Sequence, residues 1–401
     1  MNNALRDIYQ RVLGDVPQDY HRFLFDIIDL NPRLIGLVGP RGVGKTTLLL
    51  QLIKEKCDLN RTFYFSADHI LFSRQTLYEF VDDLYMHHGI THFFIDEIHQ
   101  YKNWNQELKN LYDGFPDIHI VFSGSSSIDI VKGSYDLSRR ALLHHLPGLS
   151  FREYIHLKTG SEIPKINFSD LLSHEANAKL SLVSTPGIKG LFTDYLNRGY
   201  YPFSIEDQAY FKEKLANVIH KMVFEDIANF YQLKTENLIV FKKILNFLAS
   251  IPPGKTSTYS LAKNLSMNDR TIHQYLVILE EIGLIHLLTA DGTANQQLRK
   301  PEKVLLSNTN LLHLLSTERD TANFRGMQRE IFFLGAIKPA GLEAYYDKFG
   351  DYRVNDITFE IGGKNKTRTQ IQDLEHAFIV KDDAVVSYPG SIPLMFFGFL
   401  Y

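Results

Sequence analysis

The sequence predicts an α/β fold in its first part, with a mostly parallel sheet over residues 1–150. Two observations support this: short β-rich runs alternate with helical stretches, and the first such run leads directly into a glycine-rich loop. From residue 151 the pattern changes to long helical segments, and the remaining chain is expected to be organised differently. We expect a helical region over 151–245, a helix–turn–helix module over 246–318 and an α+β domain over 319–401.

The composition narrows the class of protein. A chain of 401 residues is too long for one ordinary core, so two to four domains are expected. A formal net charge of −3 provides no global basic field, so any contact with nucleic acid must come from a local patch. The single cysteine, Cys57, excludes an intramolecular disulfide framework and indicates a reducing cytoplasm.

The apolar runs are too short to cross a membrane. The C-terminal run IPLMFFGFLY (392–401) is well below the ~20 residues that a membrane span needs, and we expect it to form a buried strand. In the first domain four strands are expected, with a fifth as a candidate at 142–146, and helices between them should cover the sheet on both faces. The four strands are predicted at 34–38, 62–66, 91–96 and 118–123.

The segment GPRGVGKTT (39–47) has the spacing of a phosphate-binding loop, with a strand before it and a helix after it. Its glycines let the backbone curl around phosphate oxygens, and the helix N-terminus adds its positive dipole end. Lys45 is expected to reach the β- and γ-phosphates and Thr46 to offer its hydroxyl to Mg²⁺. The predicted ATP-contacting residues are Gly39, Pro40, Arg41, Gly42, Val43, Gly44, Lys45, Thr46 and Thr47.

The segment FFIDEIH (93–99) carries an adjacent acid pair at the end of an apolar run. Asp96 is expected to lie beside the metal, and Glu97 to act on the attacking water. Such a pair favours hydrolysis of ATP over transfer to a substrate. The alternative for Glu97 is a solvated carboxylate at a strand end.

Two further segments offer candidate catalytic groups. In VFSGSSS (121–127), Ser123 or Ser125 could sense the γ-phosphate from a strand between the two catalytic strands; a capped Ser-Gly turn is the alternative. In DLSRRALL, Arg140 (or its neighbour Arg139) could stabilise charge on the transferring phosphoryl group, in cis or from another subunit. A surface arginine pair is the alternative there.

Residues 256–288 have the sequence pattern of a helix–turn–helix. Ser257 and Asn268 can cap two helices with buried apolar stripes, and a return strand at 303–307 would complete a winged helix. LRKPEK (298–303) could add a basic wing, whereas Glu280 and Glu281 would repel phosphate. DNA contact is one interpretation, and a structural or protein-docking module is the other. The candidate DNA contacts are Lys263, Arg270, His273 and Gln274.

The tail segment 345–371 contains scattered acidic residues followed by lysines. Restriction-type nucleases use an Asp and a Glu to hold Mg²⁺ and a Lys two residues beyond the Glu. Here Glu360 is followed two positions later by Gly362, and the nearest lysine, Lys364, is ~13 Å away along an extended strand. We therefore expect a nuclease-like domain that is inactive, unless Gly362 and Gly363 bend the chain sharply.

These motifs together resemble the prokaryotic AAA-superfamily ATPases that end in a nuclease-like domain of unknown function. The broad relatives of that family are origin-recognition-type and signalling-switch ATPases. The resemblance also rests on PGLSFREYI, RGYYPF (198–203) and REIFF, and it implies a P-loop NTPase sheet, a helical lid, a winged helix and a restriction-endonuclease-like α+β domain. It implies ATP and Mg²⁺ as ligands, with Glu97 catalytic. It assigns the nuclease-like positions to Glu330, Asp351, Glu360 and Lys364.

Our main hypothesis is an ATP-hydrolysing switch whose nucleotide state repositions the winged helix and the tail, acting on DNA. Two alternatives stay open: an ATP-regulated module that binds protein partners, and a nuclease gated by ATP. The sequence leaves the oligomeric state open, and with it the question of an arginine acting in trans.

Overall fold

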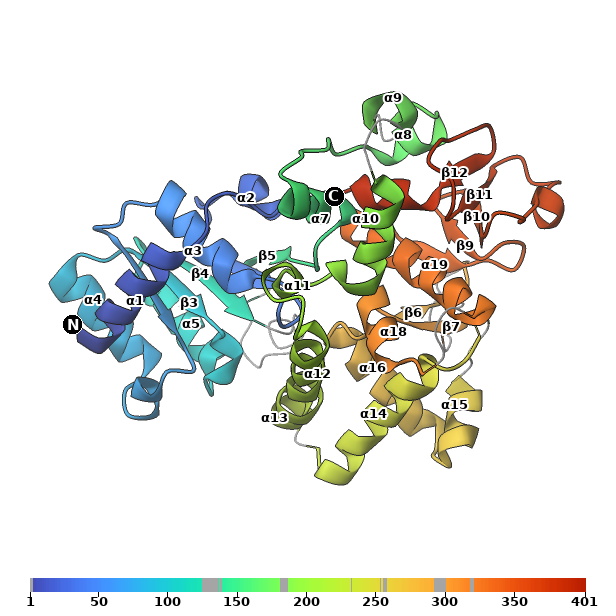
Figure 1. Cartoon of the computed structure of the whole chain (residues 1–401). Helices are drawn as coiled ribbons and strands as arrows, with labels where there is room; N and C mark the ends of the chain where they lie inside the picture. Colours follow the sequence, from blue (N-terminus) through green and yellow to red (C-terminus); the bar gives the residue numbers. More distant parts are fainter. Residues whose placement is uncertain are drawn as a thin grey trace. The chain divides into compact units, whose positions relative to one another are not determined.

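The computed structural model describes residues 3–124, 137, 139–180, 187–231, 233–252, 254, 258–291, 301–317 and 321–401. The chain divides into two compact units, Met1–Pro147 and Gly148–Tyr401, which run from blue to green and from green to red in Figure 1. The regions predicted as helical lid, helix–turn–helix and C-terminal domain all lie in the second unit.

The first unit contains a five-stranded sheet in the order β2-β3-β4-β1-β5, and every neighbouring pair is parallel. This confirms the parallel sheet, the four strands that the sequence predicts and the candidate fifth strand. Because β4 lies between β1 and β3, the carboxyl ends of these three strands meet at one edge. The strands are β1 (Leu34–Val38), β2 (Thr62–Ser66), β3 (His92–Asp96), β4 (His119–Gly124) and β5 (Leu142–His145).

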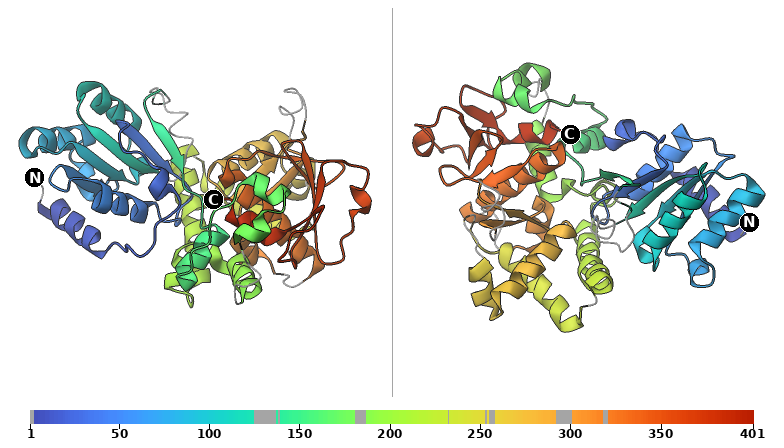
Figure 2. Two further views of the ribbon diagram at one scale, coloured as in Figure 1. Left: turned by 90° about the horizontal axis from the view of Figure 1, so that it is seen from above. Right: turned by 180° about the vertical axis from the view of Figure 1, so that it is seen from behind.

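Helices cover both faces of this sheet (Figures 1 and 2). Helix α1 packs with α3, and α4 packs with α5. All five residues of β1 are buried, as expected for a strand covered on both faces. The helical elements are α1 (Asn3–Asp15), α2 (Leu24–Ile27), α3 (Lys45–Lys56), η1 (Ile70–Ser73), α4 (Leu77–His88), η2 (Ile98–Gln100) and α5 (Trp104–Gly114).

The second unit begins with a run of helices, as predicted. Two of its elements, η4 (Tyr195–Gly199) and η5 (Met222–Asp226), are π-helical turns. The other helices are α7 (Phe151–Thr159), α8 (Phe168–Leu172), α9 (Ala176–Leu180), α10 (Ile188–Asp194), α11 (Phe203–Glu206), α12 (Phe211–Lys221), α13 (Ile227–Tyr231) and α14 (Thr235–Leu248).

Helices α15 (Thr258–Leu265) and α16 (Asp269–Glu281) pack together after α14 and are followed by an antiparallel pair, β6 (Ile285–Leu288) and β7 (Lys303–Leu306). The return strand is therefore present, while the winged-helix interpretation stays a prediction. The predicted cap Asn268 accepts a hydrogen bond from the Arg270 amide. Ser257 and the wing residues 292–300 lie outside the described residues.

The chain ends in an α+β region. Its mixed sheet has the order β12-β11-β10-β9-β8, with β8, β9 and β10 antiparallel and β10, β11 and β12 parallel. Helix α19 contacts β10. The elements are α18 (Thr309–Leu315), α19 (Ala322–Ile337), η6 (Lys338–Ala340), β8 (Ala344–Tyr346), β9 (Tyr352–Val354), β10 (Ile357–Gly362), η7 (Arg368–Gln370), β11 (Ala377–Lys381), β12 (Ser391–Pro393) and η8 (Leu394–Phe399).

The prediction of a buried strand over the last ten residues is wrong in its type. The segment is buried, but β12 ends at Pro393 and residues 394–399 form the 3₁₀ helix η8. This helix packs between α7 and α19, and a Cβ atom at Gly398 would lie 2.5 Å from the Cβ atom of Phe151. A continuous apolar run has no alternation to select a strand, so packing decided its conformation. Among the described residues, no helix is both long and apolar enough to span a bilayer.

Candidate nucleotide-binding site

The glycine-rich loop joins β1 to α3 at the carboxyl edge of the first sheet. Gly42 and Gly44 have φ angles of 84° and 93°, in the left-handed region that favours glycine. A Cβ atom at Gly39 would lie 2.2 Å from the Leu146 carbonyl oxygen, so only glycine permits this close approach. Lys45 Nζ donates to the carbonyl oxygens of Gly39, at 3.0 Å, and Pro40, at 2.9 Å. The loop therefore has the curvature that a phosphate chain requires.

Arg22, which belongs to no recognised sequence motif, anchors this loop. Arg22 is buried and donates from Nη1 to the Val43 carbonyl oxygen at 2.5 Å and from Nη2 to that of Pro147 at 2.8 Å. It thereby ties the loop to the chain that follows β5. The only signal in the sequence is one arginine within the largely apolar stretch RFLFDII (22–28).

Asp96 ends β3 and lies beside the first turn of α3. The Thr46 hydroxyl donates to Asp96 Oδ2 at 2.6 Å, and the Ser123 hydroxyl donates to Oδ1. The Tyr64 hydroxyl, which belongs to no recognised sequence motif, donates to Oδ2 at 3.1 Å. Burial and the nearby carboxylate raise the pKa of Tyr64, so it remains a proton donor. All three partners are neutral hydroxyls, which orient the carboxylate without neutralising it.

Ser123 lies in β4 and is fully buried. Its oxygen accepts a hydrogen bond from the Glu97 amide at 3.0 Å, and the same amide lies 3.1 Å from Asp96 Oδ1. The structure thus brings Ser123 together with Asp96 and Glu97, in a position that fixes the ends of β3 and β4. Ser125, the other sensor candidate, lies outside the described residues.

Glu97 has a φ angle of 50°, which is uncommon for a residue other than glycine and marks a constrained position. Its Oε2 atom lies 4.0 Å from Arg41 Nη2 in the glycine loop and 3.4 Å from His99 Nε2. Burial, together with the charges of Lys45 and Arg41, lowers the pKa of His99 to about 3. A neutral imidazole and one guanidinium therefore flank the Glu97 carboxylate at neutral pH.

Arg140 is not brought to this site within its own domain. It precedes β5 and donates from Nε to Asp113 Oδ1 at 3.0 Å, at the end of α5. Asp113 belongs to the amino edge of the sheet, because β4 begins shortly after α5 ends. The phosphate loop follows β1 at the opposite, carboxyl edge. A role for Arg140 in its own subunit is therefore not supported by this arrangement.

The predicted DNA-contacting face is partly exposed. Lys263, Arg270 and Gln274 are exposed, whereas His273 is half-buried. Tyr259, one turn before Lys263 on α15, is 70% exposed and was not identified from the sequence.

The two glutamates expected to repel phosphate already have partners inside the unit. Glu280 accepts from the Leu287 amide and from Lys338, and Glu281 accepts from the Tyr231 hydroxyl. The expected basic wing also loses Lys303, which is buried in β7.

The nuclease-like positions Glu330, Asp351 and Glu360 lie near one another in the second unit, with both glutamates buried and Asp351 half-buried. A lysine pairs with each glutamate. Lys303 Nζ forms an ion pair with Glu330, which also accepts a hydrogen bond from the Tyr352 hydroxyl. Burial raises the pKa of Glu330, and Asp351 raises it further. Within the described part of the chain, no group of three or more His, Cys, Asp or Glu side chains is arranged to hold a metal ion.

The lysine that meets Glu360 is Lys366, not Lys364. The chain turns after β10, where the Lys366 amide donates to the Gly363 carbonyl oxygen, and Lys366 Nζ forms an ion pair with Glu360 Oε1. A Cβ atom at Gly362 would lie 2.4 Å from Lys366 Cβ, so glycine allows this fold-back. The sharp bend that the sequence left open is present. The lysine that it brings to Glu360 is Lys366, six positions after the glutamate.

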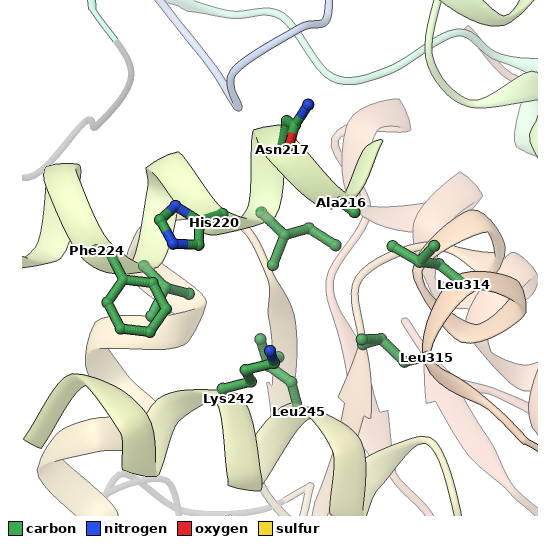
Figure 3. Close-up of a pocket in the computed structure, with 10 residues that line it drawn as sticks. Ala216, Asn217, His220, Phe224, Lys242, Leu245, Leu314 and Leu315 are labelled. Carbon is green, nitrogen blue, oxygen red and sulfur yellow. The ribbon is translucent and has the colours of Figure 1, made fainter. Parts of the chain in front are cut away.

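The helical part of the second unit contains an apolar pocket with a volume of about 310 Å³ (Figure 3). Residues of α12 and η5 form one wall, and Lys242 and Leu245 of α14 lie across from them with Leu314 and Leu315 of α18. Its lining provides no carboxylate or hydroxyl for phosphate chemistry.

Comparison with known proteins agrees with this geometry. Residues 31–155 match the model of an AAA domain, and residues 189–322 match a domain of unknown function (DUF8612). No curated protein matches the chain.

Solved structures show only low overall similarity. A structure of C. elegans PCH-2 is 20% identical, with a TM-score of 0.24; the match covers 40% of this chain and 46%, less than half, of PCH-2. AMPPCP-bound DnaA from Aquifex aeolicus is 15% identical, with a TM-score of 0.28; that match covers 69% of this chain and 88% of DnaA. The assignment of the first unit rests on the family match and on the strand order of its sheet. The chain therefore carries an AAA domain of the P-loop NTPase type, followed by a domain of unknown function.

Proposed function

We propose that the chain is a molecular switch that binds and hydrolyses ATP. The observation that carries the proposal is the contact of Thr46 with Asp96 at 2.6 Å, directly beside the loop that contains Lys45. A strand-end carboxylate and a hydroxyl at the start of the loop helix are the oxygen ligands that suit a magnesium nucleotide. When bound, Mg²⁺ would supply charge neutralisation at the phosphates, held by Thr46 and Asp96.

Different residues of the site would bind the nucleotide and hydrolyse it. Lys45 and the loop amides would bind the β- and γ-phosphates, because Lys45 Nζ lies against the carbonyl oxygens of Gly39 and Pro40 in the same loop. Glu97 would orient the attacking water and accept its proton, with its backbone held by Ser123 and Asp96. Arg41 lies 4.0 Å from the Glu97 carboxylate. It would either pair with this carboxylate or bind the γ-phosphate.

Two substitutions test this assignment separately. Lys45→Ala should weaken ATP binding by more than about tenfold, because a charge-assisted contact to phosphate is lost. Glu97→Gln should retain ATP binding and lose turnover. Calorimetric ATP titration and phosphate release report on the two steps, and Lys102→Ala, outside the site, serves as the matched control. Full turnover in Glu97→Gln would overturn the catalytic role of Glu97.

We further infer that the α15–α16 face contacts DNA. Its support is the exposed set Tyr259, Lys263, Arg270 and Gln274, together with the internal pairing of Glu280 and Glu281. Lys263→Ala/Arg270→Ala should weaken binding to duplex DNA and reduce the salt dependence of that binding by about two phosphate contacts. Lys243→Ala on α14 is the control. Equal affinity of both variants for DNA would remove this part of the proposal.

Measuring ATP turnover with and without duplex DNA distinguishes the switch from the remaining alternatives. Stimulation by DNA would link the nucleotide site to the α15–α16 face. No effect of DNA would favour a module that binds protein partners. A nuclease is the least supported alternative, because Lys303 and Lys366 already pair with Glu330 and Glu360. Mg²⁺-dependent cleavage that is lost in Glu360→Ala would restore it.

A further inference from the structure

The second unit contains a basic pocket that the proposed function does not use. Its volume is about 380 Å³, within the range of small-ligand sites. Four cationic side chains line it: Lys189 from α10, Arg325 and Arg329 from α19, and Lys364 from the turn after β10. Two carboxylates, Asp382 and Asp383, follow β11 on its wall. The lining is therefore net positive in a chain whose total charge is −3.

Among the described residues, only one of the four cationic side chains that line the pocket forms an ion pair. Arg329 Nε is bound to Asp382 Oδ2 at 2.5 Å. Among the residues that the structure describes, no ion pair involves Lys189, Arg325 or Lys364. Arg325 and Arg329 are also one helical turn apart, and such like-charge pairs are destabilising on a helix. An anion in the pocket would relieve this repulsion.

The local fold positions these groups. A Cβ atom at Gly363 would lie 2.9 Å from Arg329 Nη2, so the glycine lets the guanidinium lie against the turn that carries Lys364. Thr193 donates its hydroxyl to the Lys189 carbonyl oxygen on the neighbouring turn of α10. Phe192 and Met395, which are themselves buried, also line the pocket. The lining thus combines cationic with apolar side chains.

We propose that this pocket binds a phosphate group carried by an organic moiety. Guanidinium groups match phosphate oxygens in a bidentate geometry, and ammonium groups add point charge. The apolar side chains of the lining suit the uncharged part of the same ligand. The phosphate has two possible sources, a free phosphorylated compound or a nucleic-acid strand, and the test below distinguishes them. Lys364, the nuclease-like lysine candidate that the sequence places too far from Glu360 along an extended strand, is assigned to this ligand.

The test uses the full chain in a Lys45→Ala background, which removes the phosphate loop as a competing site. Pyrophosphate and a short single-stranded oligonucleotide are titrated by calorimetry. Arg325→Ala/Lys364→Ala should weaken binding at least about tenfold, whereas Lys243→Ala should not. Asp383→Asn, which removes a carboxylate from the wall, should tighten binding, and a folding defect cannot imitate that result.

The outcomes are distinct. Binding of pyrophosphate that is lost in Arg325→Ala/Lys364→Ala supports the proposal with a free phosphorylated compound as the ligand. Binding of the oligonucleotide alone, with the same loss, supports it with a nucleic-acid strand. If neither probe binds, or if the double variant binds both probes as tightly as Lys243→Ala does, the proposal is overturned. These results are independent of the Glu97→Gln test of ATP hydrolysis.

Discussion

Both units contain buried carboxylates, but the partners of these carboxylates differ. In the first unit, hydroxyl groups of Thr46, Tyr64 and Ser123 surround Asp96. In the second unit, lysine ammonium groups pair with Glu330 and Glu360. Hydroxyl donors orient a carboxylate and leave its charge available to a cation. Lysine partners supply the positive charge themselves, so the same kind of carboxylate becomes part of the core.

The largest effect should come from breaking the buried pair of the second unit. Lys303 is 2% exposed, so Lys303→Met would leave Glu330 without its cation in the interior. We expect a loss of about 3–5 kcal/mol in the free energy of unfolding, because an uncompensated buried charge is costly. Lys303→Met/Glu330→Gln should recover much of this loss. Denaturant unfolding of the full chain measures the free energy of unfolding of both variants. Equal stability of the single and double variants would contradict a stabilising role for the Lys303–Glu330 pair.

A second substitution tests the other side of the comparison. Asp96→Asn removes the charge that the three hydroxyls hold in place, so ATP should bind at least about tenfold more weakly in the presence of Mg²⁺. Without Mg²⁺ the difference should be smaller. Asp351→Asn is the matched control, because Asp351 accepts from the Ile361 amide in the second unit. Titrations at a fixed ATP concentration with varied Mg²⁺ would measure this difference in ATP affinity. A loss of affinity that does not depend on Mg²⁺ would argue against the role of Asp96 in holding the metal.

The pH dependence of stability should report on the buried Glu360 carboxyl of the second unit. Burial raises the pKa of Glu360, Asp351 raises it further, and Lys366 lowers it. A carboxyl with a raised pKa binds its proton more tightly in the folded chain. Its contribution is therefore full below the ordinary value of 4.5 and is lost as pH rises through the folded pKa.

Glu360→Gln should accordingly flatten the decline of the second unit's melting temperature above about pH 4.5. Melting curves measured by circular dichroism between about pH 4 and 8 would test this. A Glu375→Gln variant, at an exposed position, should retain the original profile. If Glu360→Gln keeps the same slope, the raised pKa is not a determinant of stability.

The smallest effect is expected at Arg140. Its contact with Asp113 is partly exposed, and such pairs contribute little to stability. Arg140→Ala should leave both the melting temperature and ATP affinity nearly unchanged. Turnover that falls in this variant only at protein concentrations where the chain self-associates would indicate action on a neighbouring subunit. A loss of ATP affinity in the monomer would instead contradict the position of Arg140 at the amino edge.

Much of the first unit could be predicted from the sequence, because its signals are local. The β-rich runs gave all five strands, and GPRGVGKTT gave a loop whose glycines have the φ angles that this turn requires. Arg22 and Tyr64 could not be predicted, since their contacts join segments 21 and 32 residues apart and follow no motif. Lys366 was missed for a related reason: a strand-period rule does not describe a chain that turns at Gly362 and Gly363.

The sequence by itself determined the conformation of the glycine-rich loop, because residue type, spacing and backbone freedom are all local there. Only the tertiary structure decided which charges neutralise each other. It paired Lys303 and Lys366 with Glu330 and Glu360, and it placed Lys364 in a separate basic pocket. Those pairings depend on how distant segments pack, and charge compensation over such distances has no fixed spacing along a chain.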